Sequence, residues 1–299
     1  MCRQVLAIPR LCSFLLPMVR VARLKSLAQK ADELLKLHQG PPILVLPNVW
    51  DVASAKLVER AGFPAIATSS AAVANALGYP DGERISREEM LAAVGRIAAK
   101  VSVPVTADLE AGYGASLEEI ARTAEGLLAA GAVGMNFEDS TDDPKNPLAG
   151  ITEQSARIRA LREGGERAGA HIVINARTDV YLRQVGEPGS RFEHAVRRAN
   201  AYREAGADCL FIPGVHEGDT IAKLVATVNG PINILAEPAM PAIRELERLG
   251  VRRLSFGSWP MRAAMAAFDR FVKELSSQGT FTWLGKDAMP YAELNKLFE

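Results

Sequence analysis

The segment AAGAVGMNFED, residues 129–139, contains the pattern that decides the fold. It begins where an amphipathic stretch ends, passes through Gly131, continues as the apolar run Val133–Phe137, and ends in Glu138 and Asp139. Glycine readily takes the left-handed conformation that closes a helix, so the segment predicts a helix end followed at once by a buried strand. The same junction recurs at Ala61-Gly62-Phe63, Ala205-Gly206-Ala207 and Leu249-Gly250-Val251.

Short apolar runs alternate with longer amphipathic patterns along most of the chain. The predicted strands are Ile43–Leu46, Ala65–Thr68, Val103–Ala107, Val133–Phe137, Ile172–Asn175, Cys209–Ile212, Ile232–Leu235 and Arg253–Phe256. The predicted helices are Val52–Ala61, Ser86–Lys100, Ser116–Ala130, Glu153–Ala168, Arg191–Ala205, Thr220–Val228, Pro241–Leu249 and Pro260–Glu274. Most of the strands lack strict alternation, as parallel strands covered on both faces do. Eight strand–helix units without a long linker predict a closed (β/α)8 TIM barrel.

Two local patterns support this fold over an open doubly wound sheet, which is the alternative. Ser86 with Glu89, and Ser116 with Glu119, have the S-x-x-E form of a capping box that begins a helix. Gly112-Tyr113-Gly114 lacks the third glycine of a dinucleotide-binding fingerprint, and no P-loop motif is present.

The composition excludes several functional classes. The 299 residues contain 35 Lys plus Arg and 35 Asp plus Glu, so the formal net charge is zero and nothing indicates a nucleic-acid partner. The three cysteines form neither a disulfide framework nor a metal-type pair, which fits a reducing compartment and predicts a cytoplasmic protein. We expect one catalytic barrel over residues 31–275, followed by a tail over 276–299.

Residues 1–30 are predicted to be an N-terminal extension or leader. No acidic residue occurs from Met1 to Ala31. The apolar run Leu11–Val19 contains Pro17 and is far shorter than the ~20 residues of a membrane span, so no membrane partner is expected. An organelle transit peptide, an accessory segment and an upstream start codon are alternative interpretations.

Acidic residues follow two neighbouring predicted strands, and an arginine follows the next. Asp108 and Glu110 come after one strand, Glu138 and Asp139 after another, and Arg177 lies opposite them. Catalytic groups of a TIM barrel occupy the carboxyl ends of its strands. An oxygen-only set of ligands suits Mg²⁺, or Mn²⁺, rather than zinc. The alternatives are helix-capping carboxylates and a purely structural ion pair of Arg177.

These segments resemble the isocitrate lyase/phosphoenolpyruvate mutase superfamily. TADLEAGYG (106–114) is similar to its D-x-D-x-G-Y-G stretch, with Glu110 in place of the second Asp. NFEDS (136–140) and INARTD (174–179) are similar to its E-D and A-R-T-D elements. LPNVWD (46–51) and LGYPDG (77–82) resemble its first-strand and second-loop segments. The resemblance extends from about Leu46 to Phe268.

The resemblance implies a Mg²⁺-dependent enzyme that acts on a small 2-oxo acid through an enolpyruvate-like intermediate. Asp108, Glu110 and Glu138 would hold the metal directly or through water, with Asp81 and Asp139 behind them. Arg177, Ser69, Ser70, Ala71 and Trp50 would bind the substrate; Arg177 and Ser69 would also take part in the reaction. KNPL (145–148) resembles the gating loop of the phosphonate enzymes, which implies that Asn146 touches the transferring group.

The departures from the family pattern limit the range of activities that we expect. The lyases have a K-K-C-G-H stretch after the fourth strand, where this chain has STDDPKNPL (140–148), without Cys or His. Cys209 lies inside a predicted strand and reads as an inert core residue. We therefore expect a lyase or decarboxylase of a 2-oxo dicarboxylate such as oxaloacetate. Phosphoenolpyruvate mutase or phosphonopyruvate hydrolase chemistry, and a non-catalytic metabolite-binding barrel, are the alternatives.

The family resemblance also implies a homodimer or homotetramer in which the last helix, Pro260–Glu274, is swapped between subunits. The tail after Ser276 has apolar residues that would be buried at such an interface or on the chain's own barrel.

Overall fold

The computed structural model describes residues 27–299, apart from the side chains of Lys286 and Asp287. The predicted leader, residues 1–30, lies outside the described residues except for its last four.

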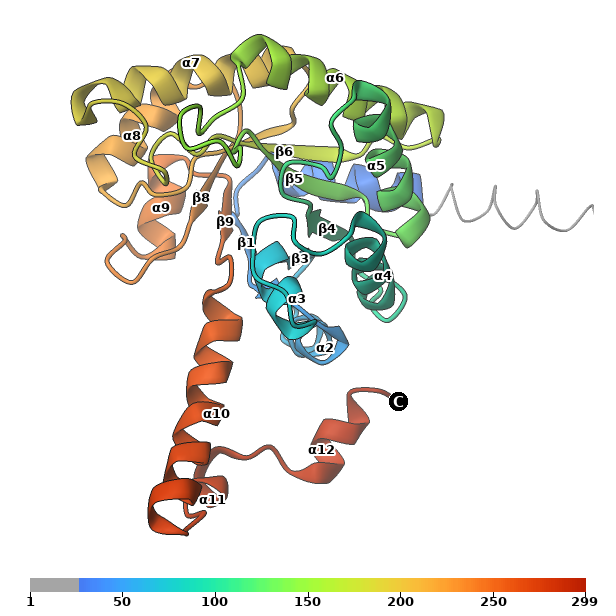
Figure 1. The fold of residues 1–299 in the computed structure, drawn as a ribbon, viewed down its shortest axis with the longest axis vertical. Coiled ribbons are helices and arrows are strands. Elements are labelled where there is room, and N and C mark those ends of the chain that lie inside the picture. Colours follow the sequence, from blue (N-terminus) through green and yellow to red (C-terminus); the bar gives the residue numbers. More distant parts are fainter. Residues whose placement is uncertain (1–26) are drawn as a thin grey trace, which may run out of the picture.

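The strands form one parallel sheet that closes into a barrel, as predicted (Figure 1). They are β1 (Leu44–Leu46), β2 (Asn48–Val49), β3 (Ile66–Thr68), β4 (Val105–Asp108), β5 (Gly134–Glu138), β6 (Val173–Arg177), β7 (Cys209–Phe211), β8 (Ile232–Leu235) and β9 (Arg253–Ser255). Strand β1 pairs with β9 and strand β2 pairs with β3. Only Pro47 separates β1 from β2, and proline has no N–H to donate to a sheet. The two segments are therefore halves of one barrel strand, and their pairings close the cylinder.

Most of the helices surround this barrel, and the predicted helices are all present (Figure 1). They are α2 (Val52–Arg60), α3 (Ser70–Ala76), α4 (Arg87–Ala98), α5 (Leu117–Ala130), α6 (Ile151–Arg167), η1 (Pro188–Ser190), α7 (Arg191–Glu204), α8 (Gly218–Thr227), α9 (Ile243–Leu249), α10 (Trp259–Gln278), α11 (Leu284–Asp287) and α12 (Tyr291–Lys296). Helix α3 was not predicted, because its seven residues are too few to show a helical period.

The predicted capping signals have the expected geometry. Ser86 and Ser116 each accept a hydrogen bond from the backbone N–H three residues on, and the glutamates at those positions complete both capping boxes. Gly131 ends α5 at φ +93°, a conformation that a side chain would strain.

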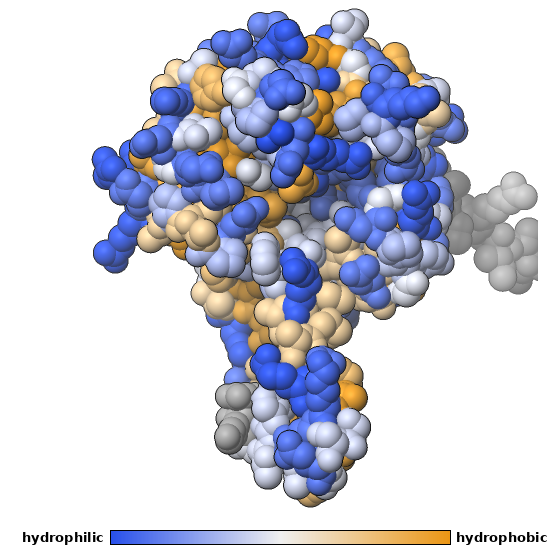
Figure 2. All heavy atoms as spheres, turned by 60° about the vertical axis from the view of Figure 1, so that its left-hand side comes forward, coloured by the Kyte–Doolittle hydropathy of each residue, from blue (hydrophilic) through white to orange (hydrophobic). Residues whose placement is uncertain are grey.

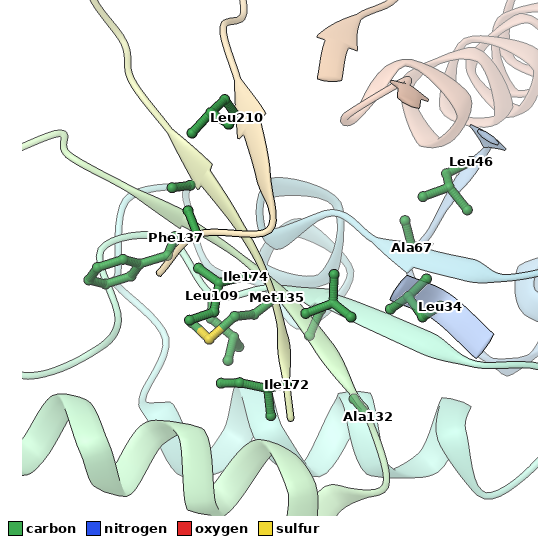
Figure 3. Packing of buried hydrophobic residues seen from close by; sticks show 14 of the residues in the cluster. Leu34, Leu46, Ala67, Leu109, Ala132, Met135, Phe137, Ile172, Ile174 and Leu210 are labelled. Carbon is green, nitrogen blue, oxygen red and sulfur yellow. The ribbon is translucent and has the colours of Figure 1, made fainter. Parts of the chain in front are cut away.

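A helix over residues 27–37 closes the amino-terminal end of the barrel. Its Leu27, Ala31 and Leu34 are buried in the same hydrophobic core as the strands. Figure 3 shows Leu34 among the strand residues Leu46 and Ala67. The packed unit therefore includes residues before 31, where the predicted catalytic domain begins.

Helix α10 contacts strand β2 of the barrel but does not lie along the barrel as the preceding helices do (Figure 1). It extends away from the strands and carries α11 and α12 at its far end (Figure 1). Met261 is its only buried residue, whereas Phe268 is 59% exposed. Figure 2 shows this arm as a narrow projection on which polar and apolar residues both reach the surface.

Among the described residues, none of the helices combines the length and the apolar character needed to span a membrane.

Candidate active site

The predicted acids and Arg177 meet at the carboxyl end of the barrel. Asp108 is the last residue of β4, Glu138 of β5, and Arg177 of β6. Asp108 is paired in register with Asn136, and Glu138 with Arg177. Parallel strands bring their carboxyl ends to one end of the barrel, so these side chains lie together there. We call this end of the barrel the mouth.

Asp108 is held in place by three hydrogen bonds. Its Oδ2 accepts from the backbone N–H of Ser70 at 3.1 Å and from the Ser70 hydroxyl at 2.8 Å. Its Oδ1 accepts from Asn136 Nδ2 at 3.3 Å. Ser70, a predicted substrate ligand, therefore uses both of these donors to orient Asp108.

Arg177 binds two carboxylates at once. Its Nη1 lies 2.7 Å from Glu138 Oε2, and its Nε and Nη2 donate to the two oxygens of Asp179 at 2.6 and 2.8 Å. Burial would lower the pKa of the guanidinium, but the charges of Glu138 and Asp179 outweigh burial and hold that pKa well above its ordinary value. Its carbon Cζ lies 5.7 Å from the centre of the Phe211 ring. The ion pair of Arg177 that the sequence left as an alternative is thus present, with Glu138 and Asp179 as its partners.

Burial, and to a lesser extent repulsion between the acids, raises the pKa values of the carboxyl groups around Arg177. Burial raises the pKa of Glu110 to about 7, and the charge of Asp108 adds to the effect. Burial also raises the pKa of Glu138, even though Arg177 favours its ionised form. Asp81 has a raised pKa because of burial and the charge of Asp108. A cation placed among these groups would relieve the repulsion.

Glu110 has a strained backbone and a fully engaged carboxylate. Its φ is +49°, in the left-handed region that ordinary residues seldom adopt. Its Oε2 accepts from the backbone N–H of Glu83 at 2.6 Å, and its Oε1 accepts from the Tyr113 hydroxyl at 2.9 Å. Glu110 thereby ties the loop after α3 to the loop after β4.

Two cavities are lined by these charged residues: Asp108 and Arg177 line one, and Glu110 and Glu138 line the other. A cavity of about 130 Å³ is lined by Asn48, Ser69, Ser70, Ala71, Asp81, Asp108, Asn136, Arg177, Phe211, Pro213, Leu235, Ser255, Gly257 and Ser258. A second cavity of about 230 Å³ is lined by Gly82, Glu83, Glu110, Ala111, Gly114, Glu138, Ser140, Thr141, Asp142, Arg157 and Arg183. The predicted substrate ligands Ser69, Ser70, Ala71 and Arg177 all line the smaller cavity, which we call the substrate cavity.

Two predicted site residues lie elsewhere. Asn146 is exposed, donates to Asp143 Oδ2 within its own loop at 2.8 Å, and lines neither cavity. The loop has the composition of a lid, but the Asn146 amide is bonded within the loop. Trp50 packs, half-buried, against the hydrophobic core and does not line the substrate cavity.

Asp139 lies buried next to the mouth and holds the backbone of Asp179. It is fully buried and accepts from the Tyr202 hydroxyl at 2.7 Å and from Arg198 Nη1 at 2.9 Å. Its Oδ1 accepts the backbone N–H of Asp179 at 3.0 Å. Asp139 therefore acts on the site through Asp179, the residue that orients Arg177.

The acids fit a divalent cation that keeps much of its own water. Within residues 27–299, no three acidic, histidine or cysteine side chains are close enough to ligate one ion together. The carboxylate of Glu138 is instead paired with Arg177, and that of Glu110 accepts hydrogen bonds from Glu83 and Tyr113. Mg²⁺ commonly binds through one or two carboxylates and retains several waters. Asp108 lines the substrate cavity and would hold such an ion directly, with Glu110 and Glu138 reaching it through water.

Sequence reasoning overlooked Asn136, although a signal for it was available. Residues two apart on a strand face the same side, so Asn136 shares the face of Glu138. Asn48 was quoted only as part of a motif; its Oδ1 accepts from the backbone N–H groups of Phe256 and Gly257 at 2.7 and 2.9 Å. It thereby joins the first and last strands at the mouth.

A barrel whose mouth gathers buried carboxylates around one guanidinium is the arrangement expected of an oxygen-ligand, metal-assisted enzyme. The chain belongs to the phosphoenolpyruvate phosphomutase family, whose model matches residues 34–276, and so to the isocitrate lyase/phosphoenolpyruvate mutase superfamily of enzymes. It is 34% identical to the uncharacterised protein Rv1998c of Mycobacterium tuberculosis, over 86% of this chain and 92% of that protein. It is 29% identical to the oxaloacetate decarboxylase of Rhodopseudomonas palustris, over 77% and 78% of the two chains.

Solved structures show the same fold. A candidate lyase/mutase from Burkholderia cenocepacia aligns with a TM-score of 0.85 and 34% identity, covering 91% of this chain and 97% of that one. Phosphonopyruvate hydrolase in complex with oxalate and Mg²⁺ aligns with a TM-score of 0.79 and 25% identity, covering 90% and 94%.

Proposed function

We propose that the protein is a Mg²⁺-dependent lyase or decarboxylase of a small 2-oxo dicarboxylic acid such as oxaloacetate. The observation that carries the proposal is the substrate cavity, where Arg177 and Asp108 face one small polar space. The similarity to an oxaloacetate decarboxylase supports the reaction, and the similarity to a Mg²⁺ complex supports the metal.

The size of the cavity supports a small substrate. A volume of about 130 Å³ is well below the roughly 300–1,000 Å³ of pockets that bind drug-sized ligands. A molecule of pyruvate or oxaloacetate size is therefore the appropriate occupant. Phe211, Pro213 and Leu235 form an apolar part of the wall, which keeps water away from a carbanion-like centre.

Arg177 and Ser69 are the groups placed to bind substrate oxygens. The planar guanidinium of Arg177 suits a carboxylate or a developing enolate oxygen. Asp179 and, behind it, Asp139 fix its orientation before the substrate arrives. A divalent cation bound at Asp108 would supply Lewis-acid polarisation of the 2-oxo group.

A reaction that needs a thiol acid is disfavoured. The loop over residues 140–148 has neither Cys nor His, and Cys209, the free cysteine of residues 27–299, is buried in β7. Cys209 does not line the substrate cavity, and burial raises the pKa of its thiol to about 12, so it is neither near a substrate there nor a ready proton donor. Decarboxylation needs enolate stabilisation but no such thiol.

Phosphonate chemistry is the second candidate. The second cavity brings Arg157 and Arg183 beside Glu138, and two guanidinium groups could neutralise a phosphonate. The similarity to phosphonopyruvate hydrolase points the same way. The substrate cavity has Arg177 as its only lining cation among the described residues, which favours the carboxylate substrate.

The exposed arm supports assembly with further copies of the chain. Met265, Phe268, Val272 and Leu275 are apolar residues of α10, each more than two-fifths exposed. A monomer would leave this surface in water, so we include a homodimer or homotetramer with swapped α10 helices in the proposal.

The decisive experiment measures pyruvate release from oxaloacetate, phosphonopyruvate and 2-methylisocitrate, each with Mg²⁺ and with EDTA. We expect Mg²⁺-dependent turnover of oxaloacetate, and loss of at least ~100-fold in kcat/KM for Arg177→Met. Turnover of phosphonopyruvate alone would replace the first candidate by the second. Inactivity on all three substrates, or full activity in EDTA, would refute the proposal.

A further inference from the structure

Arg253 is the largest completely buried side chain of residues 27–299. It opens β9, and within residues 27–299 no carboxylate lies within ion-pair distance of its guanidinium. Nη2 donates to Asn136 Oδ1 at 3.1 Å, Nη1 lies 3.4 Å from His38 Nε2, and Nε has no partner. Burial lowers the pKa of Arg253, but only to about 10, so the group is charged at neutral pH.

The contact between Arg253 and Asn136 crosses the barrel. Strand order runs β1-β9-β8-β7-β6-β5-β4-β3-β2, with β1 and β2 forming one strand. From β9 to β5 there are four strand steps in either direction around the closed cylinder. The side chain of Arg253 therefore spans the interior to reach the strand opposite its own.

This contact fixes the orientation of the Asn136 amide. Its Oδ1 accepts from two donors, Arg253 Nη2 and Asn175 Nδ2, the latter at 2.7 Å. An amide with its oxygen toward two donors must present its NH2 group on the other side. There, Nδ2 donates to Asp108 Oδ1. Rotating the amide by 180° would place N–H groups against both donors and an oxygen against the Asp108 carboxylate.

We propose that Arg253 is a positioning residue that sets the metal-binding conformation of Asp108 through Asn136. The proposal rests on the function assigned above, because Asp108 is there the residue that holds the cation. Arg253 orients the amide, the amide orients one carboxylate oxygen, and Ser70 fixes the other oxygen. Three of the roughly four acceptor sites of Asp108 are then occupied, which leaves one site, on Oδ1, for a cation at the substrate cavity that Asp108 lines.

A purely structural role explains the arginine less well. A buried charge without a counter-charge is expensive, and apolar residues of similar volume often replace buried ionic groups with no loss of stability. Arg253→Met is therefore expected to fold. By contrast, changing a group behind a metal ligand typically weakens metal affinity by about 10–100-fold.

The test is a double-mutant cycle on metal affinity, measured on the full chain with Mn²⁺ by electron paramagnetic resonance and no substrate present. We expect Arg253→Met and Asn136→Leu each to weaken Mn²⁺ binding about 10-fold, and the double variant to be weakened about 10-fold as well. Arg253→Lys, which keeps a charged donor, should stay within about 3-fold of wild type. Arg252→Met, at the half-buried neighbouring arginine, is the matched control and should bind like wild type.

Mn²⁺ affinity of folded Arg253→Met equal to wild type would overturn the proposal, as would a double variant weakened by the product of the single effects. Circular dichroism and thermal unfolding establish that each variant is folded at the temperature of measurement. If Asn136→Leu does not fold, the comparison of Arg253→Met with Arg253→Lys decides alone. Absence of Mn²⁺ binding by wild type would instead overturn the proposed function, and this inference with it.

Discussion

Replacement of Arg177 by methionine tests whether the stability of the folded protein depends on this one cation among the acids of the mouth. The substitution keeps much of the aliphatic volume but removes three charge-assisted contacts, one to Glu138 and two to Asp179. Both carboxylates stay buried, at 15% and 2% side-chain exposure. Each would lose its counter-charge without gaining access to water.

The magnitude follows from these contacts. Removing one partner of a buried ion pair costs about 3–5 kcal/mol, because it leaves an uncompensated charge. For a chain of this size, that corresponds to a fall in Tm of about 5–15 °C. The loss has a defined pH dependence. Burial already raises the folded-state pKa of Glu138, and the loss of Arg177 would raise it further above the unfolded value. When the folded-state pKa of a carboxyl group is raised, the free energy of unfolding decreases as pH increases between the unfolded-state and folded-state pKa values. The decrease is at most about 1.4 kcal/mol per pH unit.

The assay is thermal and urea unfolding of wild type and Arg177→Met at pH 6 and pH 9, without added metal. We expect the variant to be less stable at both values, with the larger difference at pH 9. Arg183→Met is the matched control, because Arg183 is exposed in a neighbouring loop; its effect should stay within about 0.5 kcal/mol. A difference that is independent of pH, or that is absent, would refute the reasoning that Arg177 compensates buried charge.

Three further predictions concern the metal, the backbone and the cysteine. Mg²⁺ should raise Tm more at pH 8.5 than at pH 6 in a thermal-shift assay, because the raised pKa of Glu110, about 7, leaves this acid protonated at the lower pH; an equal gain at both values would contradict a role of Glu110 near the metal. Gly112→Ala should cost about 2–4 kcal/mol in urea unfolding, since a Cβ would lie 2.7 Å from Phe137 Cε2 at φ +94°. Gly62→Ala, at φ +85° with open space around it, should cost only about 1 kcal/mol, and similar losses at both sites would exclude the clash as the cause. The Cys209 thiol should react with a thiol reagent only after unfolding, because burial raises its pKa to about 12; modification of this residue in the folded protein, located by peptide mapping, would show that β7 opens readily.

The sequence by itself determined the barrel, because the signals involved are local. Ser116 begins α5 through hydrogen bonds that span three residues, and Gly131 ends the same helix through its own backbone conformation. Such contacts need no distant partner, so their positions can be identified along the chain. The break at Pro47 follows from chemistry that is equally local, since proline lacks an N–H, although only the sheet pairing shows that β1 and β2 belong to one strand.

The sequence also identified the strand ends that supply Asp108, Glu138 and Arg177, since any closed parallel barrel brings those ends together. It did not determine what each side chain touches there. Glu138 and Asp139 are adjacent, and neighbouring residues of a strand point to opposite faces, so one joins the mouth and the other joins Arg198 and Tyr202.

Partners far apart in the sequence were decided by the tertiary structure alone. Glu110 is occupied by the backbone of Glu83, 27 residues away, and Arg253 reaches Asn136, 117 residues away. Sequence patterns record the period and the ends of each element, whereas these contacts depend on how loops and strands meet in space after the barrel has closed. The sequence therefore predicts which residues lie at the mouth of the barrel. The packing around them determines which carboxylate lines the substrate cavity.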